Sequence, residues 1–281
     1  MSAEVPTIEE KVIKKSEPDI HFEEVAELES PLKRIIEKIR FRIETGEYGL
    51  IIGDDASGRI PALILGNFIR RISELKGLHG PNIVFIPGKI SVEPRGSFWK
   101  RIIDSTYKKH NQEFEEYMSE HAASKEKKVL IVTDTIQSGF SLMTLVSLLR
   151  NSGYEYDIAT IGIEQPMIGK LDRNINLSGA DIFSGEYYVK ERDDHKHTPL
   201  IYDNNKLSGV SKHPGESVSR PLKLFALPEG INPEDVNPES INIYESRREI
   251  QDSISQARKD ASIVTDHLVS WYESQKQEGE K

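Results

Sequence analysis

The sequence predicts an α/β protein with a doubly wound, mostly parallel five-stranded sheet, a hood region and a C-terminal helix. Short apolar runs that end at glycine or polar residues alternate with longer segments in which apolar residues recur at helical spacing. Strands that are separated by helices pair in parallel and take helices on both faces of the sheet. The length of 281 residues, with 37% apolar residues, is enough for one sizeable α/β domain with appendages.

Each expected element has a local signal. Ser30-Pro31 is a helix start, because a hydroxyl residue is followed by proline at a first helical position, and Gly46 closes that helix. Two further helices are expected over 62–77 and 142–153. The five apolar runs that we interpret as strands are 48–53, 82–88, 127–135, 157–163 and 181–188.

The first 30 residues carry much of the negative charge. They contain nine acidic residues and three lysines, a net charge of −6, and few large apolar side chains. Such a segment buries too little surface to offset its ordering entropy. We therefore expect residues 1–30 to form an acidic disordered or loosely docked leader. The alternative is an arm that binds a partner.

The C-terminal part is expected to divide into three pieces. The main domain covers 31–225, its polar end (approximately 185–225) forms the hood, and 226–242 is a proline-containing linker. A helix is predicted over 243–276, because apolar residues recur in an alternating four-three pattern. The residues of this pattern are Ile243, Ile250, Ile254, Ala257, Ala261, Val264, Leu268 and Trp271. We expect this helix to pack on its own domain; homodimerisation through it is the alternative.

Composition excludes several classes of function. The chain has no cysteine, so it forms no disulfide and has no thiol nucleophile or cysteine-ligated zinc. The net charge of −9 gives no basic excess for nucleic acid. The apolar runs are too short to span a bilayer, so no membrane partner is expected. The N-terminus has no apolar signal segment, and we expect a cytoplasmic protein.

The segment VLIVTDTIQSGFS, residues 129–141, carries the strongest chemical signal. Four apolar residues place Asp134 at the carboxyl end of a buried strand, where its carboxylate can accept hydrogen bonds from two adjacent hydroxyls. Gly139 lets the backbone approach a ligand closely. The amides of 137–141 lie at a helix start, an arrangement that favours an anion, and Ser138 and Ser141 add hydroxyl donors. A carboxylate beside an amide nest suits a phosphorylated sugar.

This segment resembles the phosphoribosyl pyrophosphate motif of the type I phosphoribosyltransferases, and the similar order of elements covers roughly 31–225. The resemblance implies that Asp134 is the catalytic residue, whose carboxylate holds the ribose hydroxyls, and that the loop holds the 5-phosphate. It implies that magnesium arrives bound to the substrate, with no metal held by the protein alone. The substrate-binding residues implied in this segment are Thr133, Thr135, Gln137, Ser138, Gly139, Phe140 and Ser141.

Two other segments match the family in position. In GDDASGRIPAL (53–63), the resemblance places Ala56, Ser57, Gly58 and Arg59 against pyrophosphate. The alternative for Arg59 is a solvent-exposed side chain. In the hood, either Tyr187 or Tyr188 is implied to stack on a heterocyclic base, the alternative being that one of them packs in the core.

The chain also departs from the family pattern. Thr133 stands where the family has the first of two acids, and Gln137 stands where members that act on hypoxanthine or guanine have an aspartate. Asp54 and Asp55 are unexpected beside an anionic leaving group. Our first hypothesis is therefore an enzyme that transfers phosphoribosyl to a nitrogenous acceptor other than a 6-oxopurine. The second is a non-catalytic regulatory protein that binds phosphoribosyl pyrophosphate or a nucleotide.

Overall fold

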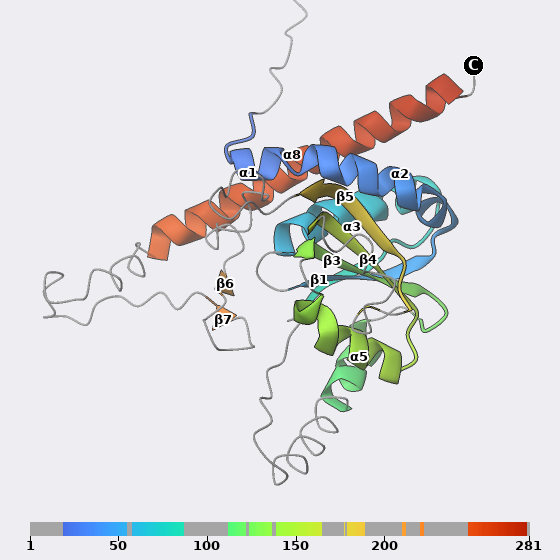
Figure 1. The fold of residues 1–281 in the computed structure, drawn as a ribbon. Coiled ribbons are helices and arrows are strands. Elements are labelled where there is room, and N and C mark those ends of the chain that lie inside the picture. The colour runs from blue at the N-terminus through green and yellow to red at the C-terminus, as the bar shows by residue number, and fades with distance from the viewer. Residues whose placement is uncertain are drawn as a thin grey trace, which may run out of the picture.

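Figure 1 shows the fold of the chain as a computed structural model. The structure describes residues 19–54, 58–86, 112–121, 124–136, 139–164, 177, 179–188, 210–211, 220–221 and 247–279. The linker expected over 226–242 and most of the expected hood lie outside these residues. Within the hood, the structure describes residues 185–188, together with β6 (Val210–Ser211) and β7 (Arg220–Pro221), which pair antiparallel.

Five strands form one parallel sheet, which confirms the expected fold class. The strands are β1 (Tyr48–Asp54), β2 (Asn82–Ile86), β3 (Lys128–Ile136), β4 (Tyr156–Glu164) and β5 (Ile182–Tyr188). They lie in the order β2-β1-β3-β4-β5, and every neighbouring pair is parallel. All seven residues of β1 are buried, as expected for a strand that is covered on both faces.

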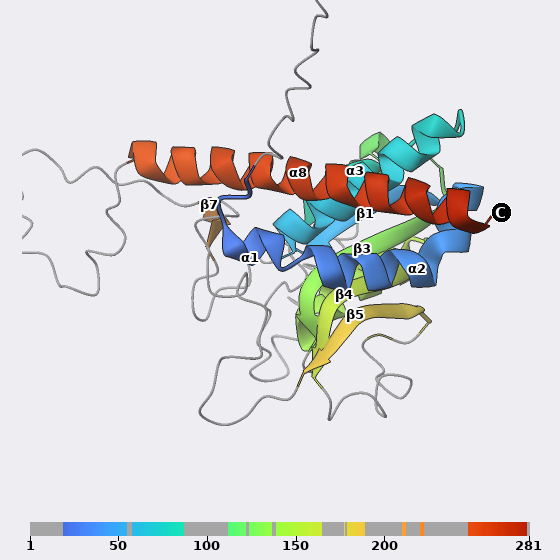
Figure 2. The same ribbon diagram turned by 90° about the horizontal axis from the view of Figure 1, so that it is seen from above.

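Helices cover both faces of the sheet (Figures 1 and 2). One face packs against α2 (Glu29–Thr45) and α3 (Arg59–Leu75), and the strand residues Ile51, Val132 and Ile161 belong to this half of the core. The other face packs against α5 (Met143–Asn151) and a helix over 112–121. Alternate residues of each strand therefore face opposite layers, as the period of two requires.

Residues 19–30, which we expected to belong to the leader, are part of the folded domain. Residues 19–30 include α1 (Glu23–Ala26) and the first residues of α2, and Val25 and Leu28 are fully or almost fully buried. The region is sparse in apolar residues, but these two join the core beneath the C-terminal helix, so tertiary contacts order it. Residues 1–18 lie outside the described part of the chain. Gly46 ends α2 in the left-handed conformation, with φ +68°, as expected for a glycine directly after a helix.

The C-terminal helix α8 (Arg247–Gly279) packs on its own domain. It runs along α3 and α1 (Figure 2), and Ala257, Ala261, Val264 and Leu268 of the predicted apolar pattern are buried there. The two alanines allow close approach of the helices. These four positions already contact the domain, so a dimer would need other residues of α8. No helix in the described ranges is long and apolar enough to cross a membrane.

A buried carboxylate joins α8 to the amino-terminal segment. Asp260 is fully buried, and its Oδ2 accepts hydrogen bonds from the backbone N–H groups of His21 (3.1 Å) and Phe22 (2.8 Å). Gln256 donates to its other oxygen at 2.8 Å. Asp260 thus satisfies donors at the start of α1 that the helix itself leaves without acceptors, and the negative charge suits that end of the helix.

We predict that Asp260→Ala lowers the free energy of unfolding by about 2 kcal/mol, because it leaves two partly buried amides without their charged acceptor. Denaturant unfolding measures this loss, and hydrogen exchange should show faster exchange in residues 19–28. The control is Asp266→Ala on the same helix, which removes only the exposed pair with Arg71 and should change stability by about 0.5 kcal/mol or less. Equal effects of the two changes would contradict this role of Asp260.

Tyr272 fixes the distal part of α8. It is 1% exposed, its hydroxyl donates to Glu44 Oε1 at 2.7 Å, and its ring meets Phe68 edge to face at 5.4 Å between centroids. Burial, together with the Glu44 carboxylate that accepts the hydroxyl proton, raises the pKa of Tyr272 to about 12. The folded protein therefore keeps this proton at a pH at which the unfolded chain releases it.

Because the pKa of Tyr272 is higher in the folded protein than in the unfolded chain, the free energy of unfolding decreases as the pH rises. The contribution of the Tyr272 proton is fully present below the unfolded pKa of about 10 and is lost as the pH rises towards 12. We predict that Tyr272→Phe, although less stable at pH 8 by about 1 kcal/mol for the lost hydrogen bond, loses less stability than the unmodified protein between pH 10 and 12. Urea unfolding at a series of pH values measures both slopes, and parallel slopes would refute the prediction.

Candidate functional site at the β1–β3 switch point

The strand order creates one crevice at the carboxyl edge of the sheet. From β1 the chain passes through α3 to β2 on one side, and later returns to β3 on the other side of β1. In open parallel sheets, ligands bind beyond the carboxyl ends of the strands, at the point where the order reverses in this way. That point lies between β1, which ends at Asp54, and β3, which has Asp134 near its carboxyl end.

Three polar side chains meet at this point. Asp54, Thr133 and Asp134 are 2%, 1% and 3% exposed. The hydroxyl of Thr133 lies 3.3 Å from Asp54 Oδ2 and 3.3 Å from Asp134 Oδ1. Two carboxylates from neighbouring strands therefore flank one hydroxyl. Such a group of oxygens suits a sugar diol, or a positive charge that develops on a bound ligand.

Strand β4 supports Asp134 from the other side. Thr160 is fully buried, and its hydroxyl donates to the backbone carbonyl of Asp134 at 3.1 Å and also lies 2.9 Å from the carbonyl of Gly162. Thr135, which we expected to bind substrate, is 9% exposed and lies beside Gly162 in the register of β3 and β4. These contacts fix the direction of the carboxyl end of β3.

Two glycines allow tight turns above the strands. The amide of Gly58 donates to the carbonyl of Asp54 at 2.9 Å, and a Cβ at this position would lie 2.5 Å from the carbonyl oxygen of Val132. Only glycine fits so close to the ends of both strands. Gly139 has φ +71°, a left-handed conformation that favours glycine, and precedes the short helix η1 (Phe140–Leu142) that leads into α5.

The structure places only some of the other expected residues. Arg59 opens α3, and its guanidinium lies 4.8 Å from the ring centroid of Phe85 on β2. Ser141 is partly exposed in η1, and the backbone of Phe140 precedes it there. Four expected site residues fall outside the described part of the chain, namely Ala56, Ser57, Gln137 and Ser138.

The two tyrosines at the end of β5 have different environments. Tyr188 is 5% exposed, and its ring covers Gly162, where a Cβ would lie 3.0 Å from it. Tyr187 is 52% exposed, and the Lys38 ammonium lies 5.9 Å from its ring centroid. The Tyr188 ring is thus part of the packing between strands. Of the two, Tyr187 has the accessible ring, and it lies two strands from Asp134, about 10 Å away across the sheet.

The opposite edge of the sheet holds a second polar group that sequence reasoning missed. Asp157 is 1% exposed, accepts a hydrogen bond from Tyr48 at 2.9 Å and pairs with Lys128 at 3.5 Å; Arg42 bridges it to Asp181. Burial and the Asp157 carboxylate raise the pKa of Tyr48, and the hydrogen bond from Arg42 lowers the pKa of Asp181. A polar residue in the otherwise apolar run of β4 was the available signal.

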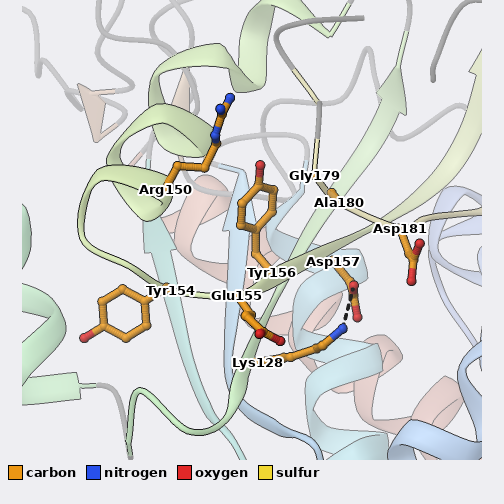
Figure 3. Close-up of a pocket in the computed structure, with 9 residues that line it drawn as sticks. All are labelled: Lys128, Arg150, Tyr154, Glu155, Tyr156, Asp157, Gly179, Ala180 and Asp181. Atoms are coloured by element: carbon orange, nitrogen blue, oxygen red, sulfur yellow. Dashed lines mark ion pairs between the residues drawn. The ribbon is translucent and has the colours of Figure 1, made fainter. Parts of the chain in front are cut away.

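These charges line a cavity at the amino ends of the strands. The cavity has a volume of about 710 Å³, and Figure 3 shows the Lys128 ammonium facing the Asp157 carboxylate at its side. Lys128, Tyr156 and Asp181 stand at or directly before the starts of β3, β4 and β5. The cavity is therefore at the opposite edge from Asp134. Its charges compensate one another, which indicates a structural role for the Asp157 group.

Comparisons with known proteins find distant matches among solved structures. No family model matches the sequence, and no curated protein matches it. Among solved structures, a purine phosphoribosyltransferase from Pyrococcus horikoshii Ot3 is 15% identical, with a TM-score of 0.29; the match covers 56% of this chain and 83% of that one. A hypoxanthine-guanine phosphoribosyltransferase from Schistosoma mansoni in complex with IMP is 15% identical, with a TM-score of 0.31 and coverage of 57% and 65%.

A third solved structure, TT1426 from Thermus thermophilus, is 12% identical, with a TM-score of 0.34; the match covers 63% of this chain and 95% of that one. At such identities and TM-scores, the activity of this chain has to be argued from its own residues.

We predict that Gly58→Ala destabilises the fold by about 1–3 kcal/mol, because its methyl group would overlap the carbonyl oxygens of Val132 and Asp54, at 2.5 and 2.6 Å. Gly58 has φ −78°, so the cost is steric and not conformational. The control is Gly77→Ala. A Cβ at position 77 would have no atom within 4 Å, so this change should cost only the about 1 kcal/mol that alanine loses in the left-handed conformation. Thermal and urea unfolding compare the two; a smaller loss for Gly58→Ala would show that the turn is not closely packed.

Proposed function

We propose that this chain binds phosphoribosyl pyrophosphate at the β1–β3 switch point and transfers its 5-phosphoribosyl group to a nitrogenous acceptor. The observation that carries the proposal is the position of Asp134. It lies near the carboxyl end of the buried strand β3, which is followed by a glycine turn and a helix start. A carboxylate for the ribose diol and a helix start for the 5-phosphate then lie in one short segment.

Burial defines how the site would work. Asp134 is 3% exposed, so a sugar reaches its carboxylate only if the residues that cover it move aside. Once a ligand is bound in that place, the carboxylate acts in a low-dielectric environment, where it stabilises a positive charge more strongly than in water. The transfer reaction develops such a charge at the anomeric carbon as pyrophosphate leaves.

Magnesium is proposed as a substrate-bound ion. Asp54, Thr133 and Asp134 present oxygen atoms, which are the ligands that magnesium prefers, so the donor chemistry fits. The described residues contain no group of three or more histidine, aspartate or glutamate side chains that would hold a metal ion alone. One or two carboxylates together with substrate phosphates are the usual arrangement for this ion. It would neutralise charge on the leaving pyrophosphate.

The acceptor is proposed to be a heterocyclic base other than a 6-oxopurine. Gln137 cannot act as a base, and it stands where the members that act on hypoxanthine or guanine have an aspartate. Tyr187 is the accessible aromatic ring at the same edge of the sheet, so it is the candidate for stacking on the acceptor. Tyr188 is assigned to packing over Gly162.

A second candidate function is a regulatory module that binds phosphoribosyl pyrophosphate or a nucleotide without turnover. Thr133 favours it, because the position next to Asp134 carries a hydroxyl and no charge. Loss of a carboxylate beside the anomeric carbon costs about 1–3 kcal/mol of transition-state stabilisation. Such a module would bind the same ligand with the same loop, and α8 would pass the signal to a partner.

We predict that calorimetry detects binding of phosphoribosyl pyrophosphate with magnesium, and that Asp134→Asn weakens it by at least about 30-fold, since charged hydrogen bonds to two hydroxyls are lost. The control is Asp181→Asn at the opposite edge, which removes one negative charge and should leave the affinity unchanged. Absence of binding by the unmodified protein, or normal binding by Asp134→Asn, would place the ligand elsewhere. Pyrophosphate release is then measured with a panel of bases. Release with one of them would identify an enzyme, and binding without release would identify a regulatory module.

A further inference from the structure

A row of buried hydroxyl groups crosses the sheet near the carboxyl ends of the strands. The β3–β4 ladder pairs Thr133 with Thr160, and the β4–β5 ladder pairs Thr160 with Ser184. The three residues are 1%, 0% and 2% exposed, and Ile158 on the same side of β4 belongs to the apolar core. A hydroxyl in such a place costs free energy unless it is hydrogen-bonded, so its partners show what it does.

Thr160 and Ser184 share one contact and differ in another. Each hydroxyl lies close to the carbonyl oxygen two residues further along its own strand, that of Gly162 at 2.9 Å and that of Glu186 at 2.5 Å. Thr160 in addition donates to the carbonyl oxygen of Asp134 on β3, at 3.1 Å. Ser184 stands on β5, and β4 separates it from β3. The bond to Asp134 therefore distinguishes Thr160 from a hydroxyl that only shapes its own strand.

We propose that Thr160 is a positioning residue for the ribose site, and that its hydroxyl holds the backbone of Asp134 so that the carboxylate is presented to the ribose diol. This inference rests on the proposed function and adds a residue that acts through Asp134. The Thr160 hydroxyl faces main-chain carbonyls, so its effect on the ligand is transmitted by Asp134.

The position of Asp134 in its strand makes this support important. Asp134 lies two residues before the end of β3, and the chain then turns at Gly139, where φ is +71°. Peptide units are planar, so holding a carbonyl oxygen fixes the orientation of the whole unit that follows Asp134. The backbone dihedrals of Asp134 then have less freedom, and its carboxylate starts from one direction. A ligand that meets a preorganised group loses less entropy on binding.

Threonine has the properties that this support requires. Its χ1 is stiff because the side chain is branched at Cβ, so the hydroxyl keeps one direction. The one hydroxyl proton is shared by two carbonyl oxygens, at 2.9 and 3.1 Å. Both acceptors are backbone groups, so the support is present before a ligand binds and does not depend on the charge of Asp134. Valine has the same branching but no hydroxyl, and serine has the hydroxyl without the branching.

The experiment compares three single variants with the unmodified protein. Thr160→Val removes the hydroxyl, Thr160→Ser keeps it, and Ser184→Ala removes the matched hydroxyl on β5. Calorimetry measures the affinity for phosphoribosyl pyrophosphate with magnesium, and Tm is measured without ligand. We expect Tm to fall by about 2–4 °C in Thr160→Val and in Ser184→Ala, since each loses a buried hydrogen bond. The affinity should fall at least about fivefold in Thr160→Val only, and stay within about twofold in the other two variants.

A double-mutant cycle separates positioning from a general loss of packing. Loosened packing would weaken binding whether or not position 134 carries a charge. If Thr160 acts through the Asp134 carboxylate, adding Thr160→Val to Asp134→Asn should weaken binding by less than about twofold beyond Asp134→Asn alone. Calorimetry at high protein concentration measures these weaker affinities.

The outcomes keep the two proposals apart. If the unmodified protein does not bind the ligand, the proposed function fails, and the role of Thr160 falls with it. If it binds and Asp134→Asn binds more weakly, the site stands. Unchanged affinity in Thr160→Val, an equal loss in Ser184→Ala, or an undiminished loss in the Asp134→Asn background then overturns the assignment of Thr160 alone. Thr160→Ser adds a check that does not depend on the folding of Thr160→Val, because a loss of about fivefold with the hydroxyl retained also overturns the assignment.

Discussion

The parallel pairing of β1 with β3 is the interaction on which the site depends. It is a backbone contact between segments about 80 residues apart, and it brings Asp54 beside Thr133. The ladder also places the carbonyl oxygen of Val132 against Gly58, so the turn after β1 is shaped by the strand next to it. One set of main-chain hydrogen bonds thus determines the polar group at the edge of the sheet and the path of the chain above it.

The fold uses charge differently at the two edges of this sheet. At the amino edge, Asp157 is surrounded by Arg42, Lys128 and the Tyr48 hydroxyl, and its charge is compensated inside the protein. At the carboxyl edge, Asp54 and Asp134 stand on either side of a neutral hydroxyl. The Asp157 group is therefore a structural one, because a buried carboxylate remains charged only where cations and hydrogen-bond donors surround it.

Local patterns in the sequence predicted the elements well, because the strands are short and largely apolar and Gly46 ends its helix through its own backbone preference. Asp134 at the end of β3 followed from the same local reading. Contacts between distant segments were not predictable in this way. The acidic residues around Val25 and Leu28 conceal a short helix that packs against α8, and the contact of Asp54 with Thr133 depends on strand order and register. Tyr187 and Tyr188 are adjacent in sequence, and only the side of the strand that each occupies separates an exposed ring from a buried one.

The hydrogen bonds between Asp260 and the amides of His21 and Phe22 join residues 239 and 238 positions apart. During synthesis, the amino-terminal segment therefore leaves the ribosome long before its acceptor exists. Chains emerge from their N-terminus first, at about 5–20 residues per second, so this segment waits on the order of ten seconds or longer for α8. Until then the apolar surfaces of α2 and α3 that α8 later covers are open to solvent. The last helix to be made thus completes the core, and a chain that stops before it leaves those surfaces exposed to aggregation.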